Sequence, residues 1–540
     1  MENKYLFILY KMSGSLLTQT SPYLPNPPVE QINQQLEYLS GNQPLQALDA
    51  RFIKVTPANG GTFNKQSNMI EFRIPKMARS FIDGTQTKLN VTLEIKPVVK
   101  TGETVAYGCY ATGSFQNAIS RFEVLSSSGE VLENIINYNR NYDPLSMVYC
   151  NTSQLLGAGS VVDLYVPPNE NNPGGQAGGK KLTDATDPTA GTAFTVAKQK
   201  ISIPISLSSL FGPGANKAIP VGLMSEGLHC RLYLTTQVPE MYYSMAASTA
   251  TVPYTASYDA TSDYSVTNVS MELKALTYSR EGFAMIEKNI GRGMISWNAT
   301  QFISNSANVA PNANNLNVLL PNTNYRDVKA IILSTYYSDI TANTITFASI
   351  NSGLYKYNVL VNGDTYWNGR SIGNNNTDNL NNSRAEFVMN LLALQQNSSN
   401  YWEANSQIAT QYRFGEDDLS ISTAPNFTTY GGNIQNNTGP STIPNCTIAS
   451  LNAANHGTIS NGLNTSVTPP YIYAGISCLK STDKSRRLVG TDLRGRQVVV
   501  TMEKWNTISN ATKDDILHCT MTVGVRFELD PKTGVIRRIA

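Results

Sequence analysis

The 540-residue sequence contains little charge. Asp, Glu, Lys and Arg together make up 15% of it, and 41 basic residues nearly balance 39 acidic ones. A nucleic-acid-binding surface normally appears as a basic stripe or tail, so this balance argues against sequence-specific nucleic-acid binding. Polar, glycine and proline residues are abundant while long helical patterns are few, which favours an all-β protein with long loops.

Cysteine and histidine are also scarce, with six and three residues. The cysteines form no CxxC pair, and their irregular spacing in a long chain favours reduced, buried thiols over a disulfide framework. Cys230 and Cys519 occupy core-facing positions of alternating strands. His229 and His518 precede them on outward strand faces, and because strand neighbours point to opposite sides, we expect no metal site there.

No long apolar run is present. The segment from Tyr5 to Tyr10 is apolar but short, whereas a signal peptide needs an apolar region of about 7–15 residues. A membrane span needs about 20 apolar residues. We therefore expect a soluble protein made inside the cell.

Catalytic motifs are missing as well. The sequence has no HExxH, no Cys-rich zinc spacing and no Gly-x-Ser-x-Gly motif. The segment from Gly174 to Lys181 has the spacing of a phosphate loop, but Lys181 stands where Ser or Thr should bind magnesium. The acidic run from Glu416 to Asp418 is interpreted as a solvated loop. We expect no enzyme activity, cofactor or metal, although a carbohydrate-active β-sandwich enzyme stays open as a minor alternative.

The most informative stretch runs from Lys200 to Pro239. Apolar and polar residues alternate from Ile201 to Leu207 and again from Leu228 to Leu234, which is typical of strands with one buried face. A corner rich in glycine and proline lies between them and still contains apolar residues. These residues are Phe211, Ile219, Val221, Leu223 and Met224. The pattern predicts a buried plug that closes one end of a β-sandwich.

Similar patterns occur elsewhere in the chain. Ile119 to Ile136 is predicted as a hairpin, followed by a turn or helix at 137–147. Near the C-terminus, a strand at 471–479, a corner at 488–493 and a strand at 498–502 echo the first corner. The cleanest strand is the last, where every second residue from Leu517 to Leu529 is apolar. Two β-sandwich halves fit these patterns better than one large barrel.

The strand, Leu-Phe-Gly, proline-containing corner, Gly-Leu and second strand resemble the first jelly roll of double jelly-roll major capsid proteins. The run from Arg121 to Asn139 resembles this family too. Its members form the coats of adenovirus-, tectivirus- and virophage-like viruses, polinton-like elements and large nucleocytoplasmic DNA viruses. The resemblance implies two tandem jelly-roll β-sandwiches with long loops and a few short helices.

The predicted organisation has four parts. They are an N-terminal arm at 1–50, a first jelly roll at 51–280, a linker at 281–295 and a second jelly roll at 296–540. Within them we expect long outward loops at 167–196, 240–267 and 424–467, a short helical turn at 283–286 and a capped helix at 383–396. Residues 318–320 and 328–333 are interpreted as a pair of apolar strands.

By resemblance, the function is that of a major capsid protein whose homotrimers pack as pseudo-hexagons into an icosahedral shell. The implied partners are further copies, penton proteins and minor capsid proteins. The implied location is the virion, after synthesis in the host cytoplasm. Contact between the N-terminal arm and an inner membrane stays open. The main rival is a β-sandwich adhesin or receptor-binding module, which should carry a secretion signal or fibrous stem.

The densest basic cluster lies in the second corner. It consists of Arg486, Arg487, Arg494 and Arg496. Arginine suits paired contacts with carboxylates through its planar fork. The cluster is a candidate for inter-subunit pairing or for contact with an inner protein or membrane face, and ordinary loop solubility explains it equally well.

Overall fold

The computed structural model describes residues 49–98, 105–111, 113–149, 160–164, 182, 198–215, 217–246, 261–290, 293–309, 315–320, 324–337, 354–370, 390, 394, 473–479, 490–504 and 515–539. In these ranges the protein consists mainly of antiparallel sheets with a few short helices, as predicted. The expected loops at 167–196 and 424–467 and the expected helix at 383–396 lie almost wholly outside the described residues.

The first sandwich is formed by sheets A and B, which share an apolar core. Sheet A has the strand order β1-β11-β4-β8, with β2 also pairing to β11, and sheet B has the order β3-β9-β6-β7. The strands of sheet A are β1 (Asp49–Val55), β2 (Thr62–Phe63), β4 (Ser80–Lys96), β8 (Gln199–Ile203) and β11 (Asp263–Thr277). Those of sheet B are β3 (Met69–Ile74), β6 (Ile119–Ser126), β7 (Val131–Ile136) and β9 (Leu228–Leu234).

The second sandwich is formed by sheets A′ and B′. Sheet A′ has the order β12-β19-β14-β17, with β20 also pairing to β19, and sheet B′ has the order β13-β18-β15-β16. The strands of sheet A′ are β12 (Ile295–Val309), β14 (Val328–Tyr337), β17 (Tyr473–Ser477), β19 (Asp515–Asp530) and β20 (Val535–Ile539). Those of sheet B′ are β13 (Asn315–Leu319), β15 (Leu354–Val361), β16 (Asp364–Arg370) and β18 (Val498–Lys504).

The two sandwiches are wound in the same way. Apart from β2, β5, β10 and β20, each sandwich has eight strands along the chain. The first, third, sixth and eighth form sheet A or A′, and the other four form sheet B or B′. This alternation between two antiparallel sheets is the jelly-roll arrangement. The predicted fold class, two tandem jelly-roll sandwiches, is therefore confirmed.

A corner between the sixth and seventh strands closes one end of each sandwich. In the first, Ile219 and Ile82 exchange two backbone hydrogen bonds of 2.8 and 2.9 Å. In the second, Thr491 and Val328 do the same at 2.9 and 3.0 Å. In both cases the corner bonds to the third strand near its start. The sequence echo between the two corners thus reflects an equivalent structure.

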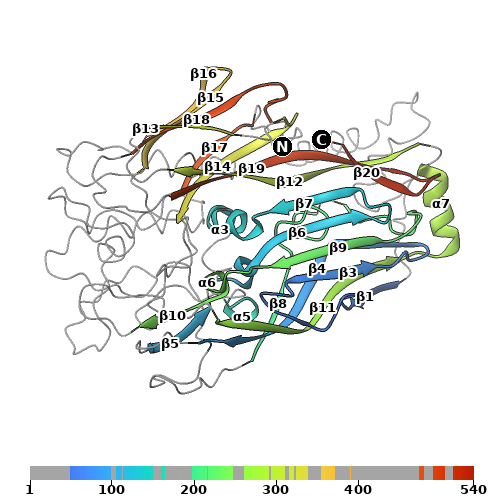
Figure 1. The fold of residues 1–540 in the computed structure, drawn as a ribbon. Helices are drawn as coiled ribbons and strands as arrows, with labels where there is room; N and C mark the ends of the chain where they lie inside the picture. The colour runs from blue at the N-terminus through green and yellow to red at the C-terminus, as the bar shows by residue number, and fades with distance from the viewer. Residues whose placement is uncertain are drawn as a thin grey trace, which may run out of the picture.

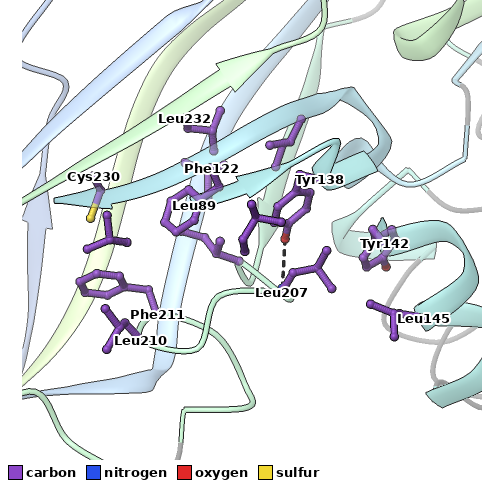
Figure 2. Close-up of a cluster of buried hydrophobic side chains, with 14 of the residues drawn as sticks. Leu89, Phe122, Tyr138, Tyr142, Leu145, Leu207, Leu210, Phe211, Cys230 and Leu232 are labelled. Atoms are coloured by element: carbon purple, nitrogen blue, oxygen red, sulfur yellow. Dashed lines mark hydrogen bonds between the residues drawn. The ribbon is translucent and has the colours of Figure 1, made fainter. Parts of the chain in front are cut away.

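The first corner is the buried plug that the sequence predicts. Leu210 and Phe211 are almost wholly enclosed and lie close to Cys230 of β9 (Figure 2). The predicted core position of Cys230 is confirmed, as is that of Cys519 in β19, since both side chains are fully buried. Burial of these thiols raises their pKa values, to about 12 for Cys519.

Short helices and a small two-stranded sheet accompany the first sandwich. They are β5 (Val105–Ala111), β10 (Tyr242–Ala246), η1 (Phe115–Ala118), α3 (Tyr138–Tyr149), α5 (Ser160–Val162), α6 (Val238–Met241) and α7 (Arg280–Ile290). Helix α7 leads into the second sandwich and is longer than the predicted four-residue turn. It is capped at its start, where the Ser279 hydroxyl accepts a bond of 2.9 Å from the Gly282 N–H.

The expectation of a single loop at 240–267 was wrong, because β10 pairs with β5 and β11 already begins at Asp263. The two apolar strands expected at 318–320 and 328–333 are present as β13 and β14, and they lie in sheets B′ and A′. Strands β12, β15, β16 and β20 were missed. Part of β12 is polar on both faces because its outward face meets the first sandwich, and this obscures the strand alternation.

The four sheets lie in the order A, B, A′, B′ through the molecule. Figure 1 shows β13, β15, β16 and β18 at one side and β1, β4 and β11 at the other, with sheets A′ and B between them. Contacts between the sandwiches involve β6 and β7 of sheet B and β12 and β20 of sheet A′. The two middle sheets therefore form the junction between the sandwiches.

Candidate functional site: the junction between the two sandwiches

The first turn of α3 connects several parts of the molecule at the junction. It follows β7 through Asn137, whose φ of 51° lies in the left-handed region that asparagine tolerates. The Tyr138 hydroxyl donates to Oε1 of Gln116 in η1 at 2.6 Å and accepts from the Leu207 N–H at 3.2 Å (Figure 2). Tyr138 thus connects α3 to η1 and to the first corner.

The next residue connects α3 to a third segment. The Asn139 amide donates to Oε2 of Glu240 in α6 at 3.1 Å, and the same oxygen accepts from the Thr235 hydroxyl. Burial raises the pKa of Glu240, and these hydrogen bonds and the charge of Arg140 oppose the rise. The carboxyl group thus holds α6 against α3 inside the protein.

Arg140 connects α3 to the second sandwich. Its guanidinium carbon lies 5.5 Å from the ring centre of Tyr336 in β14, within the range of a cation–π contact. The Tyr336 hydroxyl is 3.2 Å from the Arg140 carbonyl and 3.1 Å from Oδ2 of Asp143. Tyr336 is enclosed, and this burial raises its pKa well above the usual value.

Asn141 forms the centre of the junction. Its Nδ2 donates to the Ile136 carbonyl at 3.0 Å, so the amide oxygen is the acceptor that faces β19. This oxygen lies 2.9 Å from Nε2 of His518 and accepts from the Thr520 hydroxyl at 2.8 Å. Ser306 of β12 lies 2.8 Å from Nδ1 of His518. One asparagine therefore joins β7 of the first sandwich to β19 of the second.

His518 is held as a neutral donor. Because the Asn141 oxygen accepts, Nε2 carries the proton and Nδ1 accepts from the Ser306 hydroxyl. Burial and the nearby charge of Arg140 lower the pKa of His518 to about 3. The expected position of His518 on the outward face of its strand is confirmed. Its side chain does point away from its own core, but the first sandwich covers it completely.

The free edge of β7 is capped by side chains of β12. Gln301 donates from Nε2 to the Leu132 carbonyl at 3.0 Å, and the Ser304 hydroxyl donates to the Ile136 carbonyl at 2.8 Å. An uncapped strand edge presents unpaired carbonyls that invite pairing with another chain. The polar residues of β12 therefore use this edge to hold the sandwiches together.

A second contact lies at the corner end of the molecule. The Ser225 N–H of the first corner donates to the Gly534 carbonyl at 2.9 Å, in the turn between β19 and β20. Gly534 has a φ of 67°, and a Cβ atom there would collide with the Ser225 backbone. Glycine thus permits both the turn and the close approach.

Glu133 fixes the first corner to sheet B near this contact. Its carboxylate accepts from the Ser208 hydroxyl at 2.6 Å and from the Ser209 N–H at 2.7 Å, and the side chain is fully buried. Burial raises its pKa, while these bonds and the charge of Arg538 in β20 act in the opposite direction. The corner, sheet B and β20 are therefore coupled electrostatically.

Of the predicted arginine cluster, the structure describes Arg494 and Arg496. Arg486 and Arg487 lie outside the described residues. Arg494 is exposed and pairs with Asp492 in its own corner, with Nη2 2.7 Å from Oδ2. The backbone N–H of Arg496 donates to the Leu493 carbonyl at 3.1 Å. A role for these arginines in contacts between subunits stays a prediction.

Sequence reasoning missed the junction residues. It predicted a turn or helix after β7 but gave that segment no role. The available signal was a run of four hydrogen-bonding side chains, Tyr138 to Asn141, directly after an apolar strand. Neither Asn141 nor His518 alone indicates that they meet, because 377 residues separate them along the chain.

Within the described ranges, no group of three or more potential metal ligands is found. No helix in the part of the chain that the structure describes is both long and apolar enough to cross a membrane. Among the buried carboxyl groups of the first sandwich, those of Glu133, Asp163 and Glu240 each bond to other segments of the chain. The described site is thus a structural junction made of hydrogen bonds.

No protein-family model matches the chain, and no curated protein sequence matches it. Among solved structures, it is similar to a chain of the Sputnik virophage, with 12% identity, a TM-score of 0.53 and coverage of 95% of this chain and 92% of that one. The Faustovirus major capsid protein aligns at 10% identity and a TM-score of 0.49, over 97% and 98% of the chains. A chain of the PBCV-1 virus capsid aligns at 9% identity and 0.48, over 93% and 99%.

The likeness to the Sputnik chain shows a shared fold along nearly the whole length of both chains. The resemblance to double jelly-roll major capsid proteins is thereby confirmed at the level of the fold, in agreement with the paired eight-strand winding described above.

Proposed function

We propose that this chain is a viral major capsid protein whose homotrimers assemble into an icosahedral shell. The observation that carries the proposal is the junction: two jelly rolls with the same strand order are held together by hydrogen bonds around the fully buried Asn141 and His518. Rigid sandwiches fix the shape of a tile while their loops vary the contacts. A chain with two such units is a rigid building block.

The proposed assembly unit has three chains. Each chain supplies two sandwiches, so a cyclic trimer presents six similar units and packs like a hexagon. Cyclic symmetry closes such an assembly without leaving open ends. The near-neutral charge of the chain also permits close lateral packing.

The proposed role is assembly rather than catalysis. A carbohydrate-active enzyme needs two carboxylates that converge in a cleft open to a glycan. The buried carboxyl groups described here instead connect segments of the first sandwich. Glu133 bonds to the first corner, Asp163 to the Phe115 N–H at 2.9 Å, and Glu240 to Asn139.

The proposed partners follow from this role. They are neighbouring trimers, penton proteins and minor capsid proteins in the virion, after synthesis in the host cytoplasm. The N-terminal arm at 1–50 is proposed to contact the inner side of the shell, where a membrane is one candidate. Arg486, Arg487, Arg494 and Arg496 are proposed to pair with carboxylates of neighbouring subunits.

Sedimentation of the purified chain tests the proposal, followed by electron microscopy of particles formed on expression. We expect a compact species of three chain masses and, under assembly conditions, closed shells. A stable monomer that forms no particles at any concentration would contradict the proposed function.

A further inference from the structure

We propose that the buried contact between Asp163 and Ser114 is a pH-sensitive latch inside the first sandwich. It fastens the residues after α5 to η1 and, through Gln116, supports the first turn of α3, which carries the junction. The latch tightens as the solution becomes acidic and loosens toward neutral pH. It lies within one chain, so it goes beyond the proposed function and does not depend on trimer formation.

The Asp163 carboxyl group sits on the start of η1. Its Oδ1 accepts from the Phe115 N–H at 2.9 Å, and its Oδ2 bonds to the Ser114 hydroxyl. The same Phe115 N–H lies 3.3 Å from the Asp163 carbonyl oxygen. Ser114 is the N-cap residue of η1, and its hydroxyl oxygen accepts from the Gln116 N–H at 3.0 Å. The position of η1 therefore depends on this carboxyl group.

Gln116 connects η1 to α3. Its Oε1 accepts from the Tyr138 hydroxyl at 2.6 Å and from the Ser206 N–H at 3.3 Å. Tyr138 begins the turn of α3 in which Asn141 bonds to His518 of the second sandwich. Gln116, Tyr138 and Asn141 are all almost wholly buried. Because closely packed interiors transmit small displacements, a shift of η1 should reach the junction.

The Asp163 carboxyl group is enclosed without a cation. Asp163 is 7% exposed, and within the described ranges it has no ion pair with lysine, arginine or histidine. The titratable group that faces it is Tyr138, whose pKa is raised by its own burial and also by the charge of Asp163. No residue of η1 is charged, and β8, which α5 also contacts, carries Lys200 on its exposed side. A carboxylate enclosed in this way is costly, so the closed latch favours the neutral form.

Protonation changes what the two carboxyl oxygens do. In the neutral form, Oδ1 still accepts from the Phe115 N–H, and the proton on Oδ2 is donated to the second lone pair of the Ser114 oxygen. Burial raises the pKa of Asp163 from 3.8 to about 7, although its bonds to Ser114 and Phe115 oppose the shift. Opening returns the carboxyl group to water and to its ordinary pKa. Opening is therefore coupled to the loss of a proton between pH 3.8 and pH 7.

The residue after Asp163 is held in a strained conformation. Leu164 has a φ of 56°, in the left-handed region that residues with a Cβ atom rarely adopt. Its side chain is nevertheless buried in the core, whereas Val161, three residues earlier, is 78% exposed. Opening would relieve this strain at Leu164. The strain therefore favours opening once the contact of Asp163 weakens.

Hydrogen exchange of the wild-type chain tests the latch without any variant. The readout is the protection of residues 113–118 in η1 and 138–145 in α3 across the acidic and neutral range, corrected for the intrinsic exchange rate. We expect protection of η1 to fall about tenfold per pH unit up to pH 7 and then to level off. The first turn of α3 should follow in the same direction. Acid destabilisation through His518 acts the opposite way, so the two effects are separable.

One variant and a matched control assign the effect to Asp163. Asp163→Asn keeps an acceptor for the Phe115 N–H and a donor for Ser114 but does not titrate, so η1 and α3 should keep constant protection. Asp83→Asn changes a partly exposed carboxylate that pairs with Lys274 at 3.8 Å, and it should keep the wild-type slope.

Three results would overturn the latch. They are a flat wild-type profile, an equal slope in Asp163→Asn, and a slope in η1 that does not reach α3. A monomeric wild type in sedimentation would instead overturn the proposed function and leave the latch standing.

Discussion

The outer faces of sheets A and A′ occupy equivalent places in two sandwiches of equal winding, yet they carry different side chains. On A′, the β19 residues His518, Thr520 and Thr522 are uncharged and buried. On A, the β11 residues Glu272 and Lys274 are charged and partly exposed. The strand order is the same, so the difference comes from what covers each face.

The comparison shows how one fold is adapted to two uses. An unpaired charge is costly to bury, so a permanently covered face uses neutral groups. A face that is open in the single chain can keep charges, which favour solubility and make any contact sensitive to salt. The junction is therefore a permanent contact, whereas the outer face of sheet A is open in the single chain.

The largest expected effect comes from breaking the junction at Asn141. Asn141→Leu leaves Nε2 of His518 and the Thr520 hydroxyl without their acceptor, and each buried polar group left unsatisfied costs about 1–3 kcal/mol. We expect the free energy of unfolding to fall by about 3 kcal/mol or more, measured by chemical denaturation.

The matched control for Asn141 lies on the open face. Asn90 of β4 is half-buried on the outer side of sheet A, so Asn90→Leu should change the same quantity by about 0.5 kcal/mol or less. Equal losses for the two variants would show that the covered and open faces do not differ as described.

A smaller effect is expected where β20 meets the first corner. Gly534→Ala introduces strain at a φ of 67° and a collision with Ser225. Gly363→Ala introduces comparable strain at a φ of 89°, but nothing lies within 4 Å of the new Cβ. Backbone strain of this kind costs about 1–3 kcal/mol. We expect both variants to melt at lower temperature, and Gly534→Ala by more, because only there is the junction disturbed.

The pH dependence of stability should separate the junction from the first sandwich. An unfolded histidine titrates near its ordinary value of 6.5, whereas in the folded protein the pKa of His518 is lowered to about 3. The unfolded chain therefore binds the proton first, so stability is complete above pH 6.5 and declines as the pH falls toward 3. His518→Gln, which keeps an amide donor, should flatten this decline in melting temperature. An unchanged acid profile would contradict the buried neutral state.

Asp163, in the first sandwich, should change stability with pH in the opposite direction. Burial raises its pKa from 3.8 to about 7, although the Ser114 hydroxyl and the Phe115 N–H act against the shift. Stability from this group is present below pH 3.8 and declines as the pH rises to 7. Asp163→Asn should remove that decline while leaving the acid decline due to His518 in place, as followed by melting temperature.

The smallest effect is expected at Arg494. Its pair with Asp492 is exposed, and exposed ion pairs contribute little to stability. Arg494→Ala should leave the melting temperature unchanged within error. If the predicted inter-subunit role is right, the variant should instead lower the yield of particles, counted by electron microscopy. A clear drop in melting temperature would point to a role within the chain.

Much of the architecture could be predicted because local sequence patterns indicate its strands and corners. Alternation marks β9 and β19, where one face meets a core, and the glycine-punctuated corners mark the sandwich ends. The pattern fails in β12, where Gln301 and Ser304 serve the junction from opposite faces of the strand. The polar character of the β12 side chains is set by their contact with the first sandwich, and the local sequence does not reveal this contact.

The junction could not be predicted for a related reason. His518 was expected on the outward face of its strand because it alternates with apolar residues, and alternation indicates only which side of a strand lies away from its own core. Whether the outward side of β19 is exposed to solvent depends on a helix that begins 380 residues earlier, at Tyr138. Long-range contacts of this kind need the folded structure.

The proposed function depends most on the closure of three copies into one ring. Electron microscopy of the purified assembly at a resolution that separates sheets tests it directly. We expect three copies around one axis, with six sandwiches in one ring. A stable dimer related by a two-fold axis would contradict it.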